Sequence, residues 1–138
     1  MKVSIFTDGG ARGNPGPAAL GVYAEDEDKN ELVRIGKRLG EQTNNFAEYS
    51  AIAEALSWAI ENKKKLGIKG VSVYMDSQLA YSQLSGLYKV KNSAIREFVF
   101  KIKQMEVEAG FPISYTHIPR EKNKKADFMV NFALDNKL

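Results

Sequence analysis

Side chains alternate between two faces with a period of two residues at 3–8, the spacing of a β-strand whose last residue is Asp8. The same alternation returns at 20–24 and 33–39, on either side of a polar run, as in an antiparallel hairpin. Two later apolar runs also have the length of a strand. We therefore predict five strands, at 3–8, 20–24, 33–39, 71–76 and 111–118.

Between the third and fourth of these strands the period becomes helical. Over 43–63, apolar residues recur every three or four positions, which predicts a long amphipathic helix. Thr43, Asn44 or Asn45 is available as its N-cap, and Gly67 ends it after three lysines that suit the negative end of the helix dipole. The order of elements predicts an α/β fold, a mixed sheet flanked by helices. Further helices are expected after Asp76 up to a break near Gly86, at 93–109, and at 123–136.

Length and composition narrow the class of protein. With 138 residues, 43% of them hydrophobic, the chain fits a single domain spanning 1–138. The lack of cysteine excludes a disulfide framework and a thiolate metal site, and no apolar run reaches the ~18 residues of a membrane span. We expect a soluble, cytoplasmic monomer with no membrane partner. A net charge of +3 favours a polyanionic partner only mildly, and ordinary surface charge is the alternative.

A glycine- and proline-rich segment, TDGGARGNPGP at 7–17, begins at the end of the first strand. Its glycines allow backbone conformations that other residues avoid, while Pro15 and Pro17 fix φ. So constrained a turn can hold a ligand close to its backbone, which makes it a candidate binding loop beside Asp8. A plain hairpin turn with a capping aspartate is the alternative, because short glycine motifs are weak evidence.

Two carboxylates are predicted on helix faces that should be buried. Glu48 lies four residues before Ile52, on the apolar face of the helix at 43–63. Asp127 shares a face with Val130 and Leu134 in the last helix. A buried charge needs a partner, and in a chain with several such acids a metal ion serves them all.

Asp8 and Asp76 each end an apolar strand, where open α/β sheets place their ligand crevice. Together with Glu48 and Asp127 they offer hard oxygen ligands, which favour Mg²⁺ or Mn²⁺ over zinc in a chain without cysteine and with one histidine. Each acid taken alone also fits a role as a helix cap or surface residue. Their joint placement favours a metal site.

Five segments in this order resemble ribonuclease H, type 1, and they cover nearly the whole chain. The resemblance implies a ribonuclease H-like fold with a five-stranded mixed sheet of order 3-2-1-4-5, and cleavage of the RNA strand of RNA/DNA hybrids. The segments are TDGGARGNPGP at 7–17, TNNFAEYSAI at 43–52, MDSQ at 75–78, VKN at 90–92 and HIPREKNKKAD at 117–127.

The resemblance also implies the roles of the acids. Two Mg²⁺ ions, with Mn²⁺ as a substitute, would be held by the four carboxylates, and Asp8 would bridge them. Asp127 would help to hold the ion that activates water, while Glu48 and Asp76 would hold the ion beside the leaving group. Two ions about 4 Å apart suit this hydrolysis, which leaves 5′-phosphate and 3′-hydroxyl ends.

The substrate contacts implied by the resemblance come from short polar side chains. They suit the 2′-hydroxyls of the wide minor groove and a pocket for a DNA-strand phosphate. Helix capping is the alternative role for Thr43 and Asn44, and it is compatible with substrate binding. A place in a turn, without any substrate contact, is the alternative for Asn14 and Asn92. The expected contacts are Asn14, Asn44 and Gln78 at 2′-hydroxyls, with Glu48 near one of them, Thr43 and Asn92 at the phosphate, and Asn45 beside them.

One cation is expected to assist catalysis, and two residues are candidates. Members of this family often carry a histidine ten residues before the last acid, the position of His117. The short segment after it favours a place within the final strand, which makes Arg120 the alternative group to approach the scissile phosphate. An imidazole titrates near neutrality and a guanidinium does not.

The sequence departs from the usual pattern of the family in two ways. It lacks the basic helical protrusion that many family members insert after the third acid, and we see no N-terminal hybrid-binding module, so we expect weaker substrate binding. The expected basic surface comprises Arg12, Lys89, Lys91, Lys122, Lys124 and Lys125.

Two other classes of protein are alternatives to a nuclease. An actin-like ATPase half would need a second lobe to enclose its nucleotide. A non-catalytic RNA/DNA hybrid-binding module would not need four acids whose burial is costly.

Overall fold

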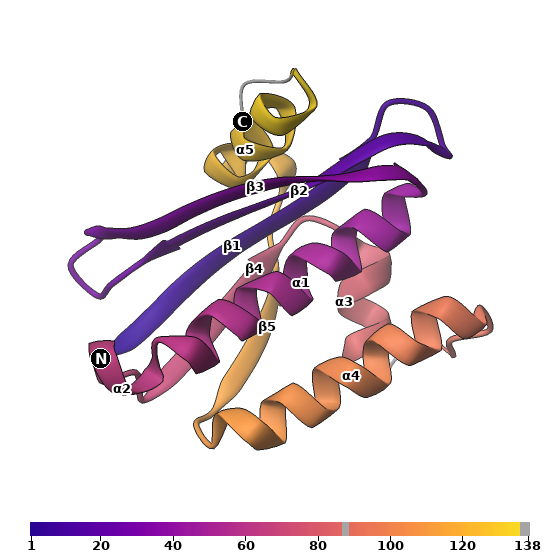
Figure 1. The fold of residues 1–138 in the computed structure, drawn as a ribbon. Helices are drawn as coiled ribbons and strands as arrows, with labels where there is room; N and C mark the ends of the chain where they lie inside the picture. The colour runs from indigo at the N-terminus through magenta and orange to yellow at the C-terminus, as the bar shows by residue number, and fades with distance from the viewer. Residues whose placement is uncertain (87–88, 136–138) are drawn as a thin grey trace.

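The computed structural model describes residues 1–86 and 89–135. Five strands form one mixed sheet in the order β3-β2-β1-β4-β5, as predicted. Neighbouring strands are antiparallel from β1 to β3 and parallel from β1 through β4 to β5 (Figure 1). The strands are β1 (Lys2–Ala11), β2 (Gly16–Glu25), β3 (Glu31–Gln42), β4 (Gly70–Met75) and β5 (Ile113–His117).

The helices lie where the apolar periodicity places them, with one division. The helix expected at 43–63 ends at Glu61, and Gly67, in the left-handed region at φ 68°, ends a separate short helix. The final helix was expected to reach residue 136, which lies outside the described residues. The elements are α1 (Asn44–Glu61), α2 (Lys63–Leu66), α3 (Gln78–Leu84), α4 (Ser93–Ala109), the 3-10 helix η1 (Arg120–Lys122) and α5 (Lys124–Leu134).

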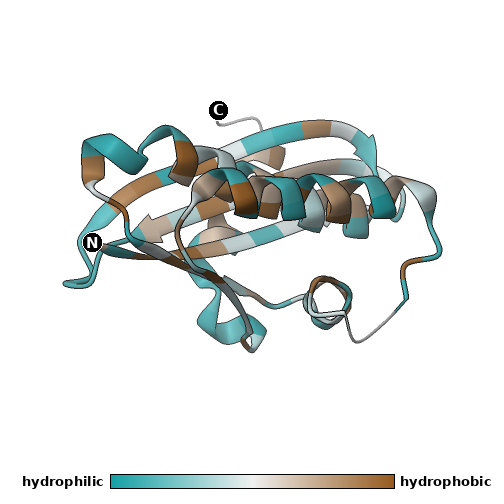
Figure 2. Ribbon diagram, turned by 90° about the horizontal axis from the view of Figure 1, so that it is seen from below, coloured by the Kyte–Doolittle hydropathy of each residue, from teal (hydrophilic) through white to brown (hydrophobic). Residues whose placement is uncertain are grey.

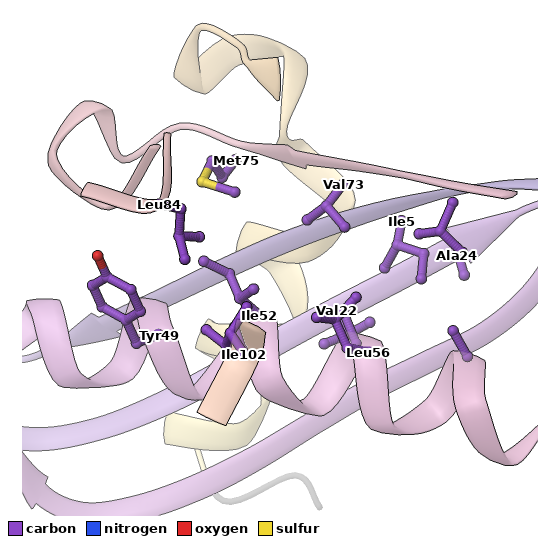
Figure 3. Packing of buried hydrophobic residues seen from close by; sticks show 14 of the residues in the cluster. Ile5, Val22, Ala24, Tyr49, Ile52, Leu56, Val73, Met75, Leu84 and Ile102 are labelled. Atoms are coloured by element: carbon purple, nitrogen blue, oxygen red, sulfur yellow. The ribbon is translucent and has the colours of Figure 1, made fainter. Parts of the chain in front are cut away.

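The main core lies between one face of the sheet and the helices α1 and α4. Side chains such as Ile5 and Val73 point from the sheet toward Ile52 of α1 and Ile102 of α4 (Figure 3). The helices are hydrophobic on part of their circumference and hydrophilic on the rest, as expected for helices that cover a sheet (Figure 2). The opposite face is covered in part by α5 (Figure 1). Within the described ranges, no helix combines the length and apolarity needed to cross a membrane.

The first strand is longer than predicted, so Asp8 does not end it. β1 continues to Ala11 and pairs with β2 over this whole stretch, including Asp8 with Gly21. Gly9 therefore belongs to a strand rather than to a turn. Its missing side chain has a packing reason, because a Cβ there would lie 2.2 Å from the main chain of Ala47 in α1. The true turn comes later, and it is closed by a hydrogen bond from the Arg12 amide to the Pro17 carbonyl.

Candidate metal and catalytic site

A cavity of about 660 Å³ opens where the carboxyl-terminal ends of β1 and β4 meet the first turns of α1 and α5. Acidic and amide side chains make up about half of its lining, and two arginines, Arg12 and Arg120, also face it. The acids and amides of the lining include Asp8, Glu48, Asp76, Asp127, Asn14, Asn44 and Asn45.

The parallel register of β1 and β4 brings the first two acids together. The pairing of these strands ends at Thr7 and Met75. Asp8 and Asp76 are the residues that follow this last pair, so they lie side by side. Asp8 is 7% exposed, and the Gly9 amide donates to its Oδ1 at 3.0 Å. Asp8 thus marks the end of the parallel pairing, although its own strand continues beside β2.

Glu48 reaches the same point from α1. The close approach of Gly9 to the main chain of Ala47 places the first turns of α1 against β1. Glu48 is 8% exposed, and its Oε2 is buried without a hydrogen-bond partner among the described residues. One carboxylate oxygen from each of Asp8, Glu48 and Asp76 lies within 4.8 Å of the other two.

Asp127 differs from the prediction, because its side chain is exposed rather than buried. It lies in the first turn of α5 at the margin of the cavity, while Val130, one turn later, is buried beneath the helix. Asp127 is nevertheless close enough to Asp8 to raise the pKa of that carboxyl. It therefore faces the three clustered acids without belonging to their tight group.

Burial and the charges of neighbouring acids raise the pKa of two carboxyls in the cluster. Burial raises the pKa of Asp8 to about 7, with further contributions from the charges of Asp76 and Asp127. Burial, followed by the charges of Asp8 and Asp76, raises the pKa of Glu48 well above its usual range. Such a cluster is stable in its charged form only beside a cation.

This donor set fits a divalent ion. It consists of oxygen atoms, the ligands that Mg²⁺ and Mn²⁺ prefer, and it includes a buried Glu48 oxygen that no group in residues 1–86 and 89–135 satisfies. Asp8, Glu48 and Asp76 could coordinate such an ion directly.

Asn123 is a site residue that the sequence reading missed. It is 1% exposed, and its Nδ2 donates to the carbonyl of Thr7 at 2.8 Å and to Oδ2 of Asp76 at 3.1 Å. An asparagine just before a helix is usually taken for a cap, yet its side chain makes no capping bond to α5. Only the packing of the 3-10 turn against β1 and β4 reveals its role.

Three of the polar residues assigned to substrate lie together at the cavity, namely Asn14, Asn44 and Asn45. Asn14 Oδ1 accepts from the Asn44 amide at 3.0 Å, and Asn44 Oδ1 accepts from the Ala11 amide at 2.8 Å. These bonds fix the turn after β1 against the start of α1.

The other three lie outside the cavity lining. Thr43 caps α1 by accepting from the Phe46 amide at 3.1 Å, and Asn92 caps α4 by accepting from the Ile95 amide at 3.1 Å. The capping alternative is thus confirmed for Thr43, and Asn44 bonds to β1 instead of capping. Gln78 is an exposed residue at the start of α3.

The structure separates the two candidate cations. His117 is the last residue of β5, and its Nε2 lies 3.3 Å from the main-chain oxygen of Asp76. It does not line the cavity, whereas Arg120 in η1 does. Arg120 is therefore the better placed of the two to meet an anionic ligand.

The sheet order and the acidic cavity define a ribonuclease H-like domain. Residues 6–133 match the protein family described as reverse transcriptase-like. A ribonuclease HI of Halobacterium salinarum is 36% identical over 98% of this chain and 65% of its own length. The crystal structure of LC11-RNase H1 in complex with an RNA/DNA hybrid is 44% identical over 98% of both chains, with a TM-score of 0.91. This chain belongs to the ribonuclease H family, type 1.

Some relatives are longer than this chain. A bifunctional protein of Mycobacterium tuberculosis is 37% identical over 98% of the chain, which spans only 36% of that protein.

Proposed function

We propose that this chain is a metal-dependent endonuclease that hydrolyses the RNA strand of RNA/DNA hybrids. The observation that carries the proposal is the cluster of Asp8, Glu48 and Asp76, which each place one carboxylate oxygen within 4.8 Å of the others in an open cavity. The name of the Halobacterium salinarum relative and the hybrid bound to LC11-RNase H1 support the substrate class. The pKa values of Asp8 and Glu48 support a bound cation, because a purely structural cluster would gain nothing from such repulsion.

The acidic side chains would coordinate the metal ions. Asp8, Glu48 and Asp76, with Asp127 at the margin of the cavity, would hold two Mg²⁺ ions or Mn²⁺ in their place. When bound, two such ions activate water on one side of a phosphodiester and stabilise the leaving 3′-oxygen on the other. The products would carry 5′-phosphate and 3′-hydroxyl ends.

The remaining groups of the site would orient ligands and substrate. The Gly9 amide and the Asn123 side chain fix the carboxylates of Asp8 and Asp76. Hydrogen bonds fix the side chains of Asn14 and Asn44 beside the acids. These polar groups would contact the 2′-hydroxyls that distinguish RNA from DNA. Arg120 would meet the scissile phosphate.

The chain would work as a monomer, since all the acids of the cavity come from one copy. The cytoplasm suits a chain without cysteine.

A cleavage assay tests the proposal. A labelled RNA/DNA hybrid, an RNA duplex and a DNA duplex are incubated with the protein and Mg²⁺ or EDTA. We expect Mg²⁺-dependent cutting of the hybrid RNA strand, its loss in Asp76→Asn, and its retention in Asp28→Asn, which changes an exposed acid in the turn between β2 and β3. Hybrid binding without cutting would instead make this a binding module.

A further inference from the structure

A row of aromatic rings crosses the middle of the sheet on the face opposite α1. Phe6 pairs directly with Tyr23 of β2 and with Tyr74 of β4. The rings of Phe6 and Tyr74 are stacked, with centroids 4.9 Å apart and planes 18° from parallel, and Tyr23 lies 6.1 Å from Phe6. Because strand side chains alternate, Ile5 enters the main core and Phe6 points to the other face.

This face is covered only in part. Helix α5, which lies across the sheet from α1 and α4, packs on the carboxyl-terminal half of β1 and on β2, where Gly21 leaves room for Ala126 (Figure 1). Over the amino-terminal half, Phe6 and Tyr74 remain partly exposed while Tyr23 is buried. Two hollows, of about 210 and 590 Å³, open above these rings.

The rim of the hollows is basic. Lys125 holds its Nζ 4.3 Å from the centroid of the Tyr23 ring and donates to the Tyr23 hydroxyl at 3.0 Å. The charged residues of the rim are Lys29, Lys122, Lys124 and Lys125, against Glu25 and Glu121. Cations around partly exposed aromatic rings complement a chain of phosphates joined to flat bases.

We propose that this surface, the aromatic groove formed by Phe6, Tyr74, Lys29, Lys122 and Lys125, binds single-stranded nucleic acid. Unpaired bases would stack on Phe6 and Tyr74, and phosphates would meet the lysines. Stacking on rings displayed by a sheet is a general way to hold unpaired bases, and it tolerates any sequence.

The groove is separate from the acidic cavity and lies next to it. The two share no lining residue. Phe6 and Asp8 nevertheless project from the same face of β1, two residues apart. An unpaired end that leaves the cavity could therefore continue into the groove, although binding of a single strand does not depend on any cleavage.

The test measures binding of a labelled oligothymidylate of about ten nucleotides in EDTA by fluorescence anisotropy. Tyr74→Leu removes a ring and keeps an apolar side chain, and we expect it to weaken binding by at least about fivefold. Lys29→Gln should lower the salt dependence of log K by about 0.7. The matched controls, Phe100→Leu and Lys101→Gln, change an exposed ring and an exposed lysine on α4, across the sheet, and should leave binding unchanged.

Photocrosslinking keeps the proposal testable if Tyr74→Leu fails to fold. A 4-thiothymidine oligonucleotide bound to the wild-type protein should form adducts on Phe6 or Tyr74 themselves, which fragmentation of the crosslinked peptides assigns to single residues. Adducts confined to residues of the acidic cavity, or unchanged affinity in both groove variants, would overturn the proposal. Hybrid cleavage is scored separately, so a protein that binds the strand and cuts nothing contradicts only the nuclease function.

Discussion

The side-chain amide of Asn123 fixes the carboxylate of Asp76, donating to its Oδ2 at 3.1 Å while also donating to the main-chain carbonyl of Thr7 at 2.8 Å. One buried amide therefore joins the segment before α5 to the two parallel strands that carry Asp8 and Asp76. The geometry of the acids depends on this link, because a carboxylate repelled by its neighbours otherwise rotates toward solvent.

Asn123→Ala should affect both stability and metal binding. It leaves the buried Thr7 carbonyl unpaired, so we expect the free energy of unfolding to fall by about 1–3 kcal/mol. It also frees Asp76, so half-maximal activity should require more Mg²⁺. Urea unfolding and a Mg²⁺ titration of cleavage measure the two effects. Gln104→Ala, an exposed amide on α4, is the control; equal Mg²⁺ requirements in both variants would contradict the link.

Gly9→Ala should be severely destabilising, whereas Gly10→Ala should be tolerated. A Cβ at Gly9 would lie 2.2 Å from the main chain of Ala47, so α1 must move away from β1 and carry Glu48 with it. A Cβ at Gly10 meets only a Val130 methyl at 3.9 Å, an ordinary contact. We expect a loss of roughly 3 kcal/mol or more for Gly9→Ala. Thermal unfolding compares the two, and a well-folded Gly9→Ala protein would show that α1 adjusts freely.

The pair of glycines also shows where the sequence misleads. Alternation and helical periodicity located all five strands and the main helices, and the helix predicted at 93–109 has those bounds. The run GGARGNPGP, however, has the composition of a turn, while Gly9 and Gly10 belong to β1. For Gly9 the reason is a close contact with α1, which only the three-dimensional packing specifies.

The site was predictable to a similar degree. The inward position of Glu48 followed from the face that it shares with Ile52, and both are buried. Asp127 also shares an apolar face, yet it stays exposed, because the first turn of α5 borders an open cavity. The period of apolar residues predicts the helix face on which a side chain lies. It does not predict whether other parts of the fold bury that side chain. Asn123 has no signal of its own in the sequence, since its partners lie on distant strands.

The metal-free protein should lose stability as the pH rises. The pKa of Asp8 is about 7 in the folded state against 3.8 as its ordinary value, so the folded state binds more protons between these values. The contribution of Asp8 to the free energy of unfolding therefore falls from about pH 4 to pH 7, and Glu48 acts in the same direction.

Mg²⁺ should consequently raise the melting temperature more at pH 8 than at pH 5, since at pH 5 protons already neutralise the site. Differential scanning fluorimetry in EDTA and in Mg²⁺ measures this. Asp8→Asn should be less sensitive to both pH and Mg²⁺ than the wild type, while Asp28→Asn should behave like the wild type. An equal Mg²⁺ effect at both pH values would contradict the raised pKa.

Asn92 allows capping to be separated from phosphate binding. Its Oδ1 caps α4, and Asp caps a helix as well as Asn does, so Asn92→Asp should leave the unfolding free energy within about 0.5 kcal/mol. The new charge would repel a DNA phosphate, and KM for the hybrid should rise severalfold. Asn92→Ser retains the cap without the charge and should raise KM less. If KM is the same in Asn92→Asp and the wild type, Asn92 is a cap alone.

Arg120 should matter more for cleavage than His117. The Arg120 side chain lines the acidic cavity, while His117 ends β5 outside the lining, with its Nε2 3.3 Å from the main-chain oxygen of Asp76. A guanidinium that contacts phosphate contributes a charge-assisted hydrogen bond, so Arg120→Gln should lower kcat/KM by about tenfold to hundredfold. His117→Gln should cost far less and should leave the shape of the pH–rate profile unchanged, because an arginine does not titrate near neutrality. Steady-state cleavage across pH 5.5–9 compares the variants. If His117→Gln lowers kcat/KM as much as Arg120→Gln does, the assisting role belongs to the histidine instead.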